Sequence, residues 1–396
     1  MRVAIVHDYL NQYGGAEKVV EKWLEMYPNA EIYTSVFIPE NFKSSEIYKK
    51  TQVNEQIHTT WLQALFNHKI TLKFFKHLFW LYPIVMSFVV VRDYDLVLIS
   101  STYCAKNVKL ENCKKIIHYC HSPVRFLHGL VTETDHKSLN KLYRSLIPLF
   151  TFWLKWMDLK AVEYLNKIGT IWVGNSKFIC DLILQVYKTK SILIYPPTEI
   201  NKFLNIERNP SEQTKKSFYF SHGRISFHKR LDLAILACLE LGRPLKISGS
   251  SSLKKEMDDL KQIVSEFESK NPDKKGLIEF LGRTTDEQFF DLLKECRAFL
   301  FPGREDSGIT PIEVFASGTP VIAYQAGGAL EYLKDLENGL FFPTQTLESL
   351  KQAILKFEKM EEEFRSNQIK ETSKAFSSEV FEREIRELVI QNQLSK

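Results

Sequence analysis

Two glutamates eight residues apart, Glu305 and Glu313, carry the strongest chemical signal in this sequence, on either side of a short loop that contains a glycine. The run Thr310-Pro311-Ile312-Glu313 is typical of a helix start, with threonine as the N-cap and proline as the first helical residue. Backbone N–H groups at such a start, together with the positive end of the helix dipole, favour an anion such as phosphate. A plain capping box, in which Glu313 binds only the backbone, would explain the same spacing. The candidate N–H donors belong to Gly308, Ile309 and Thr310.

A second group of charged side chains lies on a loop between a predicted strand and the helix after it. Arg224 and Lys229 are five residues apart in the run Gly223-Arg224-Ile225-Ser226-Phe227-His228-Lys229. Arginine binds phosphate oxygens in a bidentate manner, and lysine adds a compact positive charge. Together they could neutralise a diphosphate leaving group without a metal. A solvated basic loop is the alternative explanation for this pair.

Small and polar residues follow two predicted strands in the first half of the chain. Gly14 and Gly15 stand between the first strand and the first helix, where a backbone can approach a phosphate closely. The alternative is a tight turn that needs glycine only for its dihedral angles. His121 falls just past another strand, where an imidazole could contact a sugar hydroxyl or orient an acceptor. A single histidine is more often a structural hydrogen-bonding group, and His118, inside that strand, is expected in the core.

One pattern imitates a metal site. Asp93-Tyr94-Asp95 matches the D-x-D pattern of metal-dependent sugar transferases. Asp95 directly precedes an apolar run over 96–100, so we interpret it as part of a turn at a strand start rather than as a metal ligand. The sequence has no H-E-x-x-H, Walker A or G-x-S-x-G motif. It therefore predicts neither a metal nor a resident cofactor.

Short apolar runs alternate with helical stretches along the chain, as in parallel sheets with helices on both faces. In the first half, the predicted strands are 2–8, 31–36, 96–100, 115–120, 170–174 and 191–195, and the main helices are 15–27 and 137–166. In the second half, the predicted strands are 217–221, 244–248, 277–281, 298–301 and 320–324, and the helices are 231–241, 252–269, 286–296 and 377–393. The candidate residues follow strand ends, where such sheets bind ligands.

This pattern predicts an α/β protein with two doubly wound, Rossmann-like domains, and the cleft between them is the default site for a ligand. The polar segment 207–216 is the best candidate for a linker. We expect domains over 1–200 and 201–375, followed by a helical tail over 376–396. The apolar stripe of that tail consists of Val380, Phe381, Ile385, Leu388 and Val389.

The composition is that of an ordinary globular protein. The 396 residues are 44% hydrophobic and 26% charged, which argues against a disordered, collagen-like or coiled-coil chain. The 53 Lys and Arg against 48 Asp and Glu give a net charge of +5, too small an excess to argue for nucleic acid. The six cysteines lack C-x-x-C spacing and the first residues lack the apolar region of a signal peptide, as expected of a cytoplasmic protein with reduced thiols.

A basic, aromatic segment over 61–76 predicts contact with an anionic membrane surface. Lys69, Lys73 and Lys76 interrupt a series of leucine and phenylalanine residues, as in segments that lie on anionic lipid. A core helix with a solvated lysine face is the alternative. The longest apolar run, over 78–91, is too short for a membrane span.

Taken together, these motifs resemble the retaining family 4 glycosyltransferases of the GT-B fold, and within that family the bacterial mannosyltransferases of O-antigen and exopolysaccharide assembly. The resemblance covers nearly the whole chain, and its most specific part is the pair of glutamates in its loop-and-helix setting. Its motifs in the first half include Gly14-Gly15-Ala16-Glu17, Tyr119-Cys120-His121-Ser122-Pro123 and Tyr195-Pro196-Pro197. Those in the second half include Gly223-Arg224, Lys229-Arg230, Gly318-Thr319-Pro320 and Gly327-Gly328-Ala329.

The resemblance implies that the carboxyl-terminal domain holds a nucleoside-diphosphate sugar, and that Arg224 and Lys229 stabilise the departing diphosphate. Glu305 would contact hydroxyls of the transferred sugar, Glu313 would contact the ribose, and His121 would lie at the acceptor side. The remaining donor-binding residues would be Gly14, Gly15, Ser307, Gly308, Ile309 and Thr310. The terminal helix would cross back onto the amino-terminal domain, which would take a polyprenyl-diphosphate-linked acceptor.

The implied reaction is a metal-independent, retaining transfer of mannose from GDP-mannose to a lipid-linked oligosaccharide in bacterial surface polysaccharide synthesis. The enzyme would be cytoplasmic and peripheral on the inner face of the plasma membrane, with no nucleic-acid partner. One alternative is the same reaction with UDP-N-acetylglucosamine or UDP-glucose as the donor. The others are a nucleotide-sugar epimerase on the same architecture and a non-catalytic membrane assembly partner.

Overall fold

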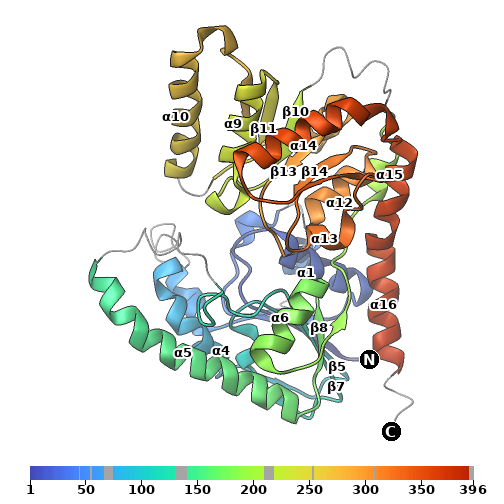
Figure 1. The fold of residues 1–396 in the computed structure, drawn as a ribbon. Coiled ribbons are helices and arrows are strands. Elements are labelled where there is room, and N and C mark those ends of the chain that lie inside the picture. The colour runs from blue at the N-terminus through green and yellow to red at the C-terminus, as the bar shows by residue number, and fades with distance from the viewer. Residues whose placement is uncertain are drawn as a thin grey trace. The chain divides into compact units, whose positions relative to one another are not determined.

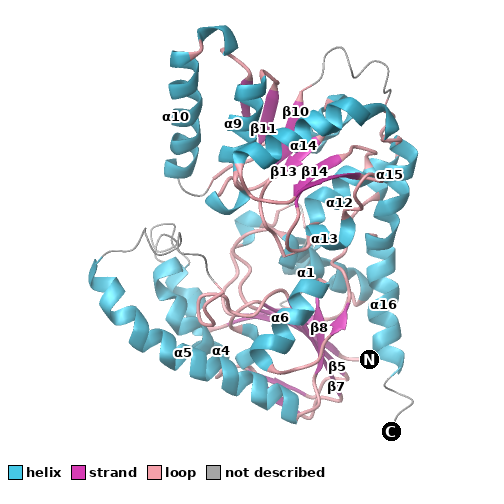
Figure 2. Ribbon diagram, viewed as in Figure 1, coloured by secondary structure: helices cyan, strands magenta, loops and turns pink. Residues whose placement is uncertain are grey.

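The computed structural model describes residues 1–43, 45–53, 56–66, 75–130, 141–208, 218–251, 254–306 and 308–391. The chain forms two compact units, one made of Met1–Pro197 with Phe381–Lys396 and the other of Thr198–Val380. In each unit, helices pack beside a sheet of parallel strands (Figures 1 and 2). Most of the expected linker, residues 209–216, lies outside the described residues.

The sheet of the first unit has seven strands in the order β3-β2-β1-β5-β7-β8-β9, paired in parallel throughout. The strands are β1 (Val3–His7), β2 (Glu31–Thr34), β3 (Ile57–Thr59), β5 (Leu96–Ser101), β7 (Lys115–Cys120), β8 (Ile171–Gly174) and β9 (Ile192–Leu193). All six predicted strands are present. Strand β3 and a small parallel pair, β4 (Val90–Arg92) with β6 (Lys109–Glu111), are not predicted from the sequence, because three residues are too few for a clear pattern.

Side chains of the central strands alternate between two hydrophobic cores, one on each face of this sheet. From β1, Ala4 and Val6 enter one core, and Val3 and Ile5 enter the other. Covering both faces explains why these strands appear in the sequence as continuous apolar runs. The helices of this unit are α1 (Gly15–Met26), α2 (Glu46–Val53), α4 (Tyr82–Met86), α5 (Lys141–Lys167), α6 (Lys177–Tyr187) and α16 (Ser378–Gln391).

The last helix, α16, contributes to the core of the first unit, as its apolar stripe and the family resemblance led us to expect. Phe381, Ile385 and Leu388 are buried in the core that also holds the apolar face of α1. The Lys115 ammonium donates hydrogen bonds to the carbonyls of Leu388, at 2.8 Å, and of Val389. These carbonyls belong to the last turn of the helix, where a cation also favours the negative end of the helix dipole.

The sheet of the second unit has six parallel strands in the order β12-β11-β10-β13-β14-β15. The strands are β10 (Tyr219–His222), β11 (Leu245–Ser248), β12 (Ile278–Gly282), β13 (Phe299–Phe301), β14 (Val321–Tyr324) and β15 (Gly339–Phe342). The five predicted strands are present and β15 is additional. The helices are α7 (Asn201–Leu204), α9 (Leu231–Leu241), α10 (Lys254–Lys270), α11 (Asp286–Glu295), α12 (Ile309–Ala316), α13 (Ala329–Tyr332), α14 (Leu347–Met360) and α15 (Ser366–Ser373).

Both sheets share one topological feature that bears on ligand binding. The strand order reverses between β1 and β5 in the first unit and between β10 and β13 in the second. In doubly wound sheets, ligands bind beyond the carboxyl ends of the strands at this reversal. The loops after these strands are therefore the places to look for a site in each unit.

Candidate active site

The loop after β10 carries both predicted cations of the second unit. Arg224 is the second residue after the strand, and Lys229 ends a short 3-10 helix over Phe227–Lys229. Both side chains line a pocket at the reversal point of the sheet. The other residues of its lining are Ser221, His222, Gly223, Leu231, Leu300, Phe301 and Pro302.

Lys229 forms an ion pair with Glu305, which stands on the loop after β13. The two side chains are 21% and 25% exposed, so a ligand could reach both. Burial, and then the positive charge of Arg224, lower the pKa of Lys229 to about 8. The carboxylate of Glu305 opposes this lowering of the pKa, because it favours the ammonium form of Lys229. The structure thus brings Arg224, Lys229 and Glu305 together, as their positions after neighbouring strands predict.

A glycine lets the two loops approach one another. A Cβ atom on Gly303 would lie 2.8 Å from the carbonyl oxygen of His228 and 2.9 Å from the Cα of Lys229. Both contacts involve backbone atoms, which cannot rotate away. Any larger residue at this position would separate the loop that bears Glu305 from the loop that bears Lys229. Gly303 is not among the predicted site residues, although it lies on the same loop as Glu305.

Helix α12 begins earlier than predicted, at Ile309, with Gly308 as the N-cap. Thr310 is therefore inside the helix, and the predicted capping box of Thr310 with Glu313 is wrong, because Glu313 lies beyond the first turn. The first turn still presents backbone N–H groups without partners inside the helix, at Ile309 and Thr310. Gly308 packs so closely on Tyr332 that a Cβ atom would lie 2.2 Å from its ring. Ser307, predicted to bind the donor, lies outside the described residues.

Gly14, Gly15 and His121 belong to the first unit and follow β1 and β7. Gly14 is the N-cap of α1, and a Cβ atom there would lie 3.2 Å from a carboxylate oxygen of Glu17. The His121 ring accepts or donates a 2.8 Å hydrogen bond at Nε2 with the Ser100 hydroxyl at the end of β5. These residues therefore gather at the reversal point of the first sheet.

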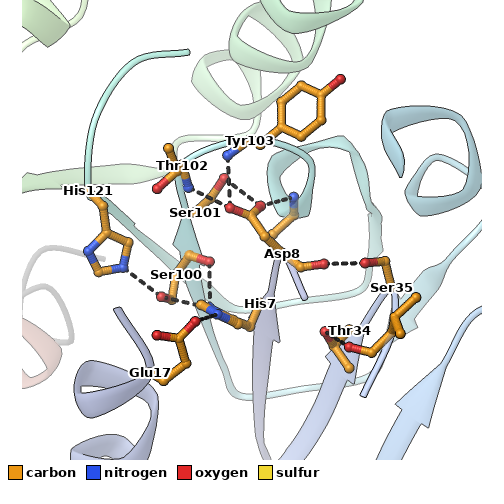
Figure 3. Close-up of polar contacts among 12 residues, drawn as sticks. His7, Asp8, Glu17, Thr34, Ser35, Ser100, Ser101, Thr102, Tyr103 and His121 are labelled. Carbon is orange, nitrogen blue, oxygen red and sulfur yellow. Dashed lines mark hydrogen bonds and ion pairs between the residues drawn. The ribbon is translucent and has the colours of Figure 1, made fainter. Parts of the chain in front are cut away.

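Asp8 is a buried carboxylate that the sequence analysis missed. It follows β1 and accepts hydrogen bonds from the backbone N–H groups of Thr102, Tyr103 and Ala105 at 2.7–2.8 Å (Figure 3). It also accepts one at 3.2 Å from the Ser101 hydroxyl. Asp8 thus holds the loop after β5 in place. The residues that donate to its carboxylate lie more than ninety positions further along the chain. The one local feature in the sequence is an aspartate directly after a buried strand.

A second buried charge cluster in this unit lies on Lys106, Asp158 and His128. The Lys106 ammonium is 2.7 Å from one oxygen of Asp158, and His128 Nε2 is 2.8 Å from the other. Burial by itself would lower the pKa of Lys106, but the Asp158 carboxylate raises it above its ordinary value. The cluster ties helix α5, which carries Asp158, to the segment after β7 that carries His128.

Two further sequence interpretations agree with the structure. Asp95 receives a 2.8 Å hydrogen bond from the backbone N–H of Arg2 and lies 2.7 Å from the Lys114 ammonium, directly before β5. It is part of a strand-start turn. His118 is fully buried and packs edge to face on Trp172, with ring centroids 4.2 Å apart. Among the described residues, no cluster of three or more His, Cys, Asp or Glu side chains could hold a metal ion.

The second unit matches a family model. Residues 203–375 match the family described as "Glycosyl transferases group 1". This range contains every described candidate residue of the second unit.

Curated relatives and a solved structure extend the similarity beyond this unit. The chain is 23% identical over 396 aligned residues to alpha-1,3/1,6-mannosyltransferase ALG2 of Rhizomucor pusillus, covering 87% of this chain and 81% of that protein. It is 27% identical over 242 residues to human ALG2, covering 55% of this chain and only 53% of the human protein. The structure of Anabaena Alr3699/HepE in complex with UDP is 18% identical, with a TM-score of 0.68, and covers 98% of this chain and 99% of that one.

The fold prediction is confirmed by these likenesses and by the two parallel sheets of the structure. The HepE likeness spans nearly both chains, so it includes both Rossmann-like units.

Proposed function

The chain is a group 1 glycosyltransferase with the GT-B fold, and from this premise we propose that it transfers mannose from GDP-mannose to a lipid-linked oligosaccharide of a bacterial surface polysaccharide. The reaction retains the configuration at the anomeric carbon. The name of the ALG2 relatives, alpha-1,3/1,6-mannosyltransferase, supports an α-linked mannose. A UDP-sugar remains the alternative donor.

The observation that carries the proposal is the meeting of Arg224 and Lys229 at the sheet reversal of the second unit, near the start of α12. Transfer of a sugar from a nucleoside diphosphate leaves a diphosphate anion and a positively charged sugar centre. Fixed cations and helix N–H groups aimed at that anion stabilise the transition state electrostatically. These groups supply the positive charge from the protein itself, so the proposal includes no metal.

The two glutamates and His121 take the remaining roles in this proposal. Glu305, paired with Lys229, accepts hydrogen bonds from hydroxyls of the transferred sugar. Glu313, further along α12, accepts from the ribose. His121 is a hydrogen-bonding group for the sugar, and the Gly14-Gly15 turn is a binding element for the diphosphate. The backbone N–H groups of Gly308, Ile309 and Thr310, with Ser307 beside them, bind the phosphates.

A thermal-shift panel tests the donor. GDP-mannose and GDP should raise the unfolding midpoint without added metal, since a ligand that binds only the native state stabilises it. UDP-glucose and UDP-N-acetylglucosamine should not; a shift with these alone would replace mannose by the UDP-sugar alternative. The Arg224→Ala variant should lose the shift, whereas Lys274→Ala should keep it. Lys274 ends the 3-10 helix Pro272–Lys274 just before β12, whereas Arg224 follows the carboxyl end of β10 in the same parallel sheet.

Product analysis separates the remaining alternatives. Incubation with GDP-mannose and a polyprenyl-diphosphate-linked acceptor should give an elongated lipid and GDP. Epimerisation of the nucleotide sugar without transfer would instead favour an epimerase. Binding of no nucleotide sugar would favour a non-catalytic assembly partner.

We further propose that the first unit binds an anionic membrane surface, where a lipid-linked acceptor would be found. The outer face of α5 exposes Phe152 to 76% and Trp156 to 53%, with exposed Lys155 and Lys160 beside them. Large aromatic side chains among lysines are typical of helices that lie at an anionic lipid surface. In the segment 61–76, which the sequence predicts to contact the membrane, Trp61 is 59% exposed. The lysines of this segment lie outside the residues whose side chains are described. Within the described part of the chain, no helix is long and apolar enough to cross a bilayer.

Vesicle sedimentation tests this surface. The protein should sediment with vesicles of phosphatidylglycerol and phosphatidylcholine, and less with phosphatidylcholine alone. The double variant Phe152→Ser/Trp156→Ser should remain in the supernatant. Leu184→Ser is the matched control, because Leu184 is 50% exposed on α6, and its loss should not matter. If the wild type, the double variant and Leu184→Ser sedimented equally, α5 would not be the membrane-binding surface.

A further inference from the structure

A continuous series of polar contacts crosses the ends of three neighbouring strands in the first unit. His7 ends β1 and lies 3.5 Å, at Nε2, from a carboxylate oxygen of Glu17. On its other side, His7 Nδ1 lies 3.0 Å from the hydroxyl of Ser100. The same hydroxyl lies 2.8 Å from Nε2 of His121 (Figure 3). Glu17, His7 and Ser100 are buried, so water does not compete for these contacts.

The direction of the hydrogen bonds follows from one backbone carbonyl. His7 Nδ1 faces the carbonyl oxygen of Ser100 at 3.2 Å as well as its hydroxyl. A carbonyl can only accept, so Nδ1 of His7 carries the proton. The Ser100 hydroxyl oxygen then accepts the hydrogen bond from His7 Nδ1, and its own hydrogen is directed toward His121. Nε2 of His121 is therefore the acceptor.

The charge state of His121 follows from its surroundings. Burial, and then the nearby His7, lower the pKa of His121 to about 3, so the ring is neutral near pH 7. A neutral imidazole has one proton, and a ring that accepts at Nε2 carries it on Nδ1. Figure 3 shows this second nitrogen directed away from Ser100. No described residue forms a hydrogen bond with it.

We propose that Ser100 and His7 are positioning residues that fix His121 as the neutral Nδ1–H tautomer, which then donates a hydrogen bond to an oxygen of the bound sugar. The inference rests on the proposed function and names the hydrogen-bonding role of His121 within it. A neutral donor suits this place, because an imidazolium would repel the positive charge that develops on the sugar during transfer. Glu17 completes the series on the far side of His7, where its carboxylate lies 3.5 Å from Nε2.

The packing of Glu17 connects this series to the predicted phosphate-binding turn. A carboxylate oxygen of Glu17 would lie 3.2 Å from a Cβ atom added to Gly14, which is closer than an ordinary van der Waals contact. The same buried residues thus support the Gly14-Gly15 turn at one end and His121 at the other. This arrangement explains why a buried glutamate follows the glycines in the first turn of α1.

The experiment measures the tautomer directly. In protein with ¹⁵N-labelled histidine, long-range ¹H–¹⁵N correlation spectra at pH 7 identify His121 by the loss of its signals in His121→Gln. We expect the Nδ1–H tautomer in the wild type and a shift toward Nε2–H in Ser100→Ala. Ser100→Thr keeps the hydroxyl and should keep the wild-type pattern. Ser101→Ala is the matched control, since this neighbouring buried hydroxyl contacts Asp8 instead.

Steady-state kinetics give a second readout. Ser100→Ala should lower kcat about tenfold, with the KM for the donor within about twofold, which corresponds to about 1.4 kcal/mol of the barrier. Ser100→Thr should recover most of kcat. A wild-type spectrum with the proton on Nε2 overturns the inference even if Ser100→Ala fails to fold. This result does not depend on whether the protein transfers mannose. A failure of the tautomer inference can therefore be distinguished from a failure of the proposed function.

Discussion

The two units have the same sheet topology at their reversal points but use opposite chemistry there. In the second unit, Arg224, Lys229 and Glu305 keep their charges partly exposed at the loops after β10 and β13. In the first unit, Asp8 and His121 are held by hydrogen bonds to backbone and hydroxyl groups, and His121 is neutral. One unit presents cations that can attract an anion, and the other holds its polar groups in fixed positions by hydrogen bonds.

The overall charge of the two units runs against this local pattern. Lys and Arg outnumber Asp and Glu in residues 1–197, whereas Asp and Glu outnumber Lys and Arg in residues 198–380. The cations that face the proposed diphosphate therefore belong to the more acidic unit. Net charge thus says little about where a phosphate binds, and the local geometry of loops decides it. The basic surface of the first unit instead fits the proposed anionic membrane.

The largest expected effect comes from removing the lysine of the second unit. Lys229→Ala should reduce mannose transfer about 10²–10³-fold, or ~3–4 kcal/mol of barrier, because the leaving diphosphate loses a fixed positive charge. Initial rates with saturating acceptor measure the effect, and Lys274→Ala serves as the control. A variant that retains more than a tenth of the wild-type rate would show that the charges of the second unit do not drive the reaction.

The buried charges of the first unit should affect folding instead. Lys106→Met leaves Asp158 buried without its cation and should lower the free energy of unfolding by about 3–5 kcal/mol in urea titrations. The double variant Lys106→Met/Asp158→Leu should recover most of this loss, since no charge is left buried. If Lys106→Met proved as stable as the wild type, the buried charges of the first unit would not serve folding, and the contrast with the second unit would fail.

The pH dependence of nucleotide binding separates the units further. The pKa of Lys229 is about 8 in the free protein, so its positive charge is present below pH 8 and is lost as the pH rises above it. Calorimetric titration should show GDP binding about tenfold more weakly at pH 9 than at pH 7. In Lys229→Arg the affinity should stay constant over this range, because arginine remains charged. An equally steep decline in that variant would assign the titration to another group.

The smallest effect is expected at the imitation metal motif. Asp95→Asn should leave the transfer rate within about twofold of the wild type, because Asp95 serves a turn through Arg2 and Lys114. Rates measured with and without EDTA complete the comparison. A large loss of activity in this variant, or a loss on adding EDTA, would instead place metal chemistry in the first unit.

The order of strands and helices could be predicted because each buried strand is a continuous apolar run. Helix α9, for example, has the predicted bounds, 231–241. Short strands such as β3 could not be predicted, because their stability depends on neighbours rather than on their own three residues. The start of α12 was misplaced because Thr310-Pro311 imitates a capping sequence, while packing on Tyr332 places the actual N-cap at Gly308.

The candidate site divides in the same way. Arg224, Lys229 and Glu305 were found because cations and carboxylates at strand ends are visible in a single sequence. Asp8 and Ser100 were missed because their partners are distant in the chain and become neighbours only when β1, β5 and β7 pair. A buried serine in a strand carries no local sign that its hydroxyl joins two histidines.

The packing of α16 on the first unit has a consequence for how the protein is made. The core of this unit needs Phe381, Ile385 and Leu388, which the ribosome synthesises only after the second unit. The second unit, by contrast, is contiguous in sequence and can complete its core while the chain is still growing. The amino-terminal unit therefore completes its core after the second unit, although most of it is synthesised before that unit. Before α16 is synthesised, the apolar surface that it covers in the first unit is exposed and could bind chaperones.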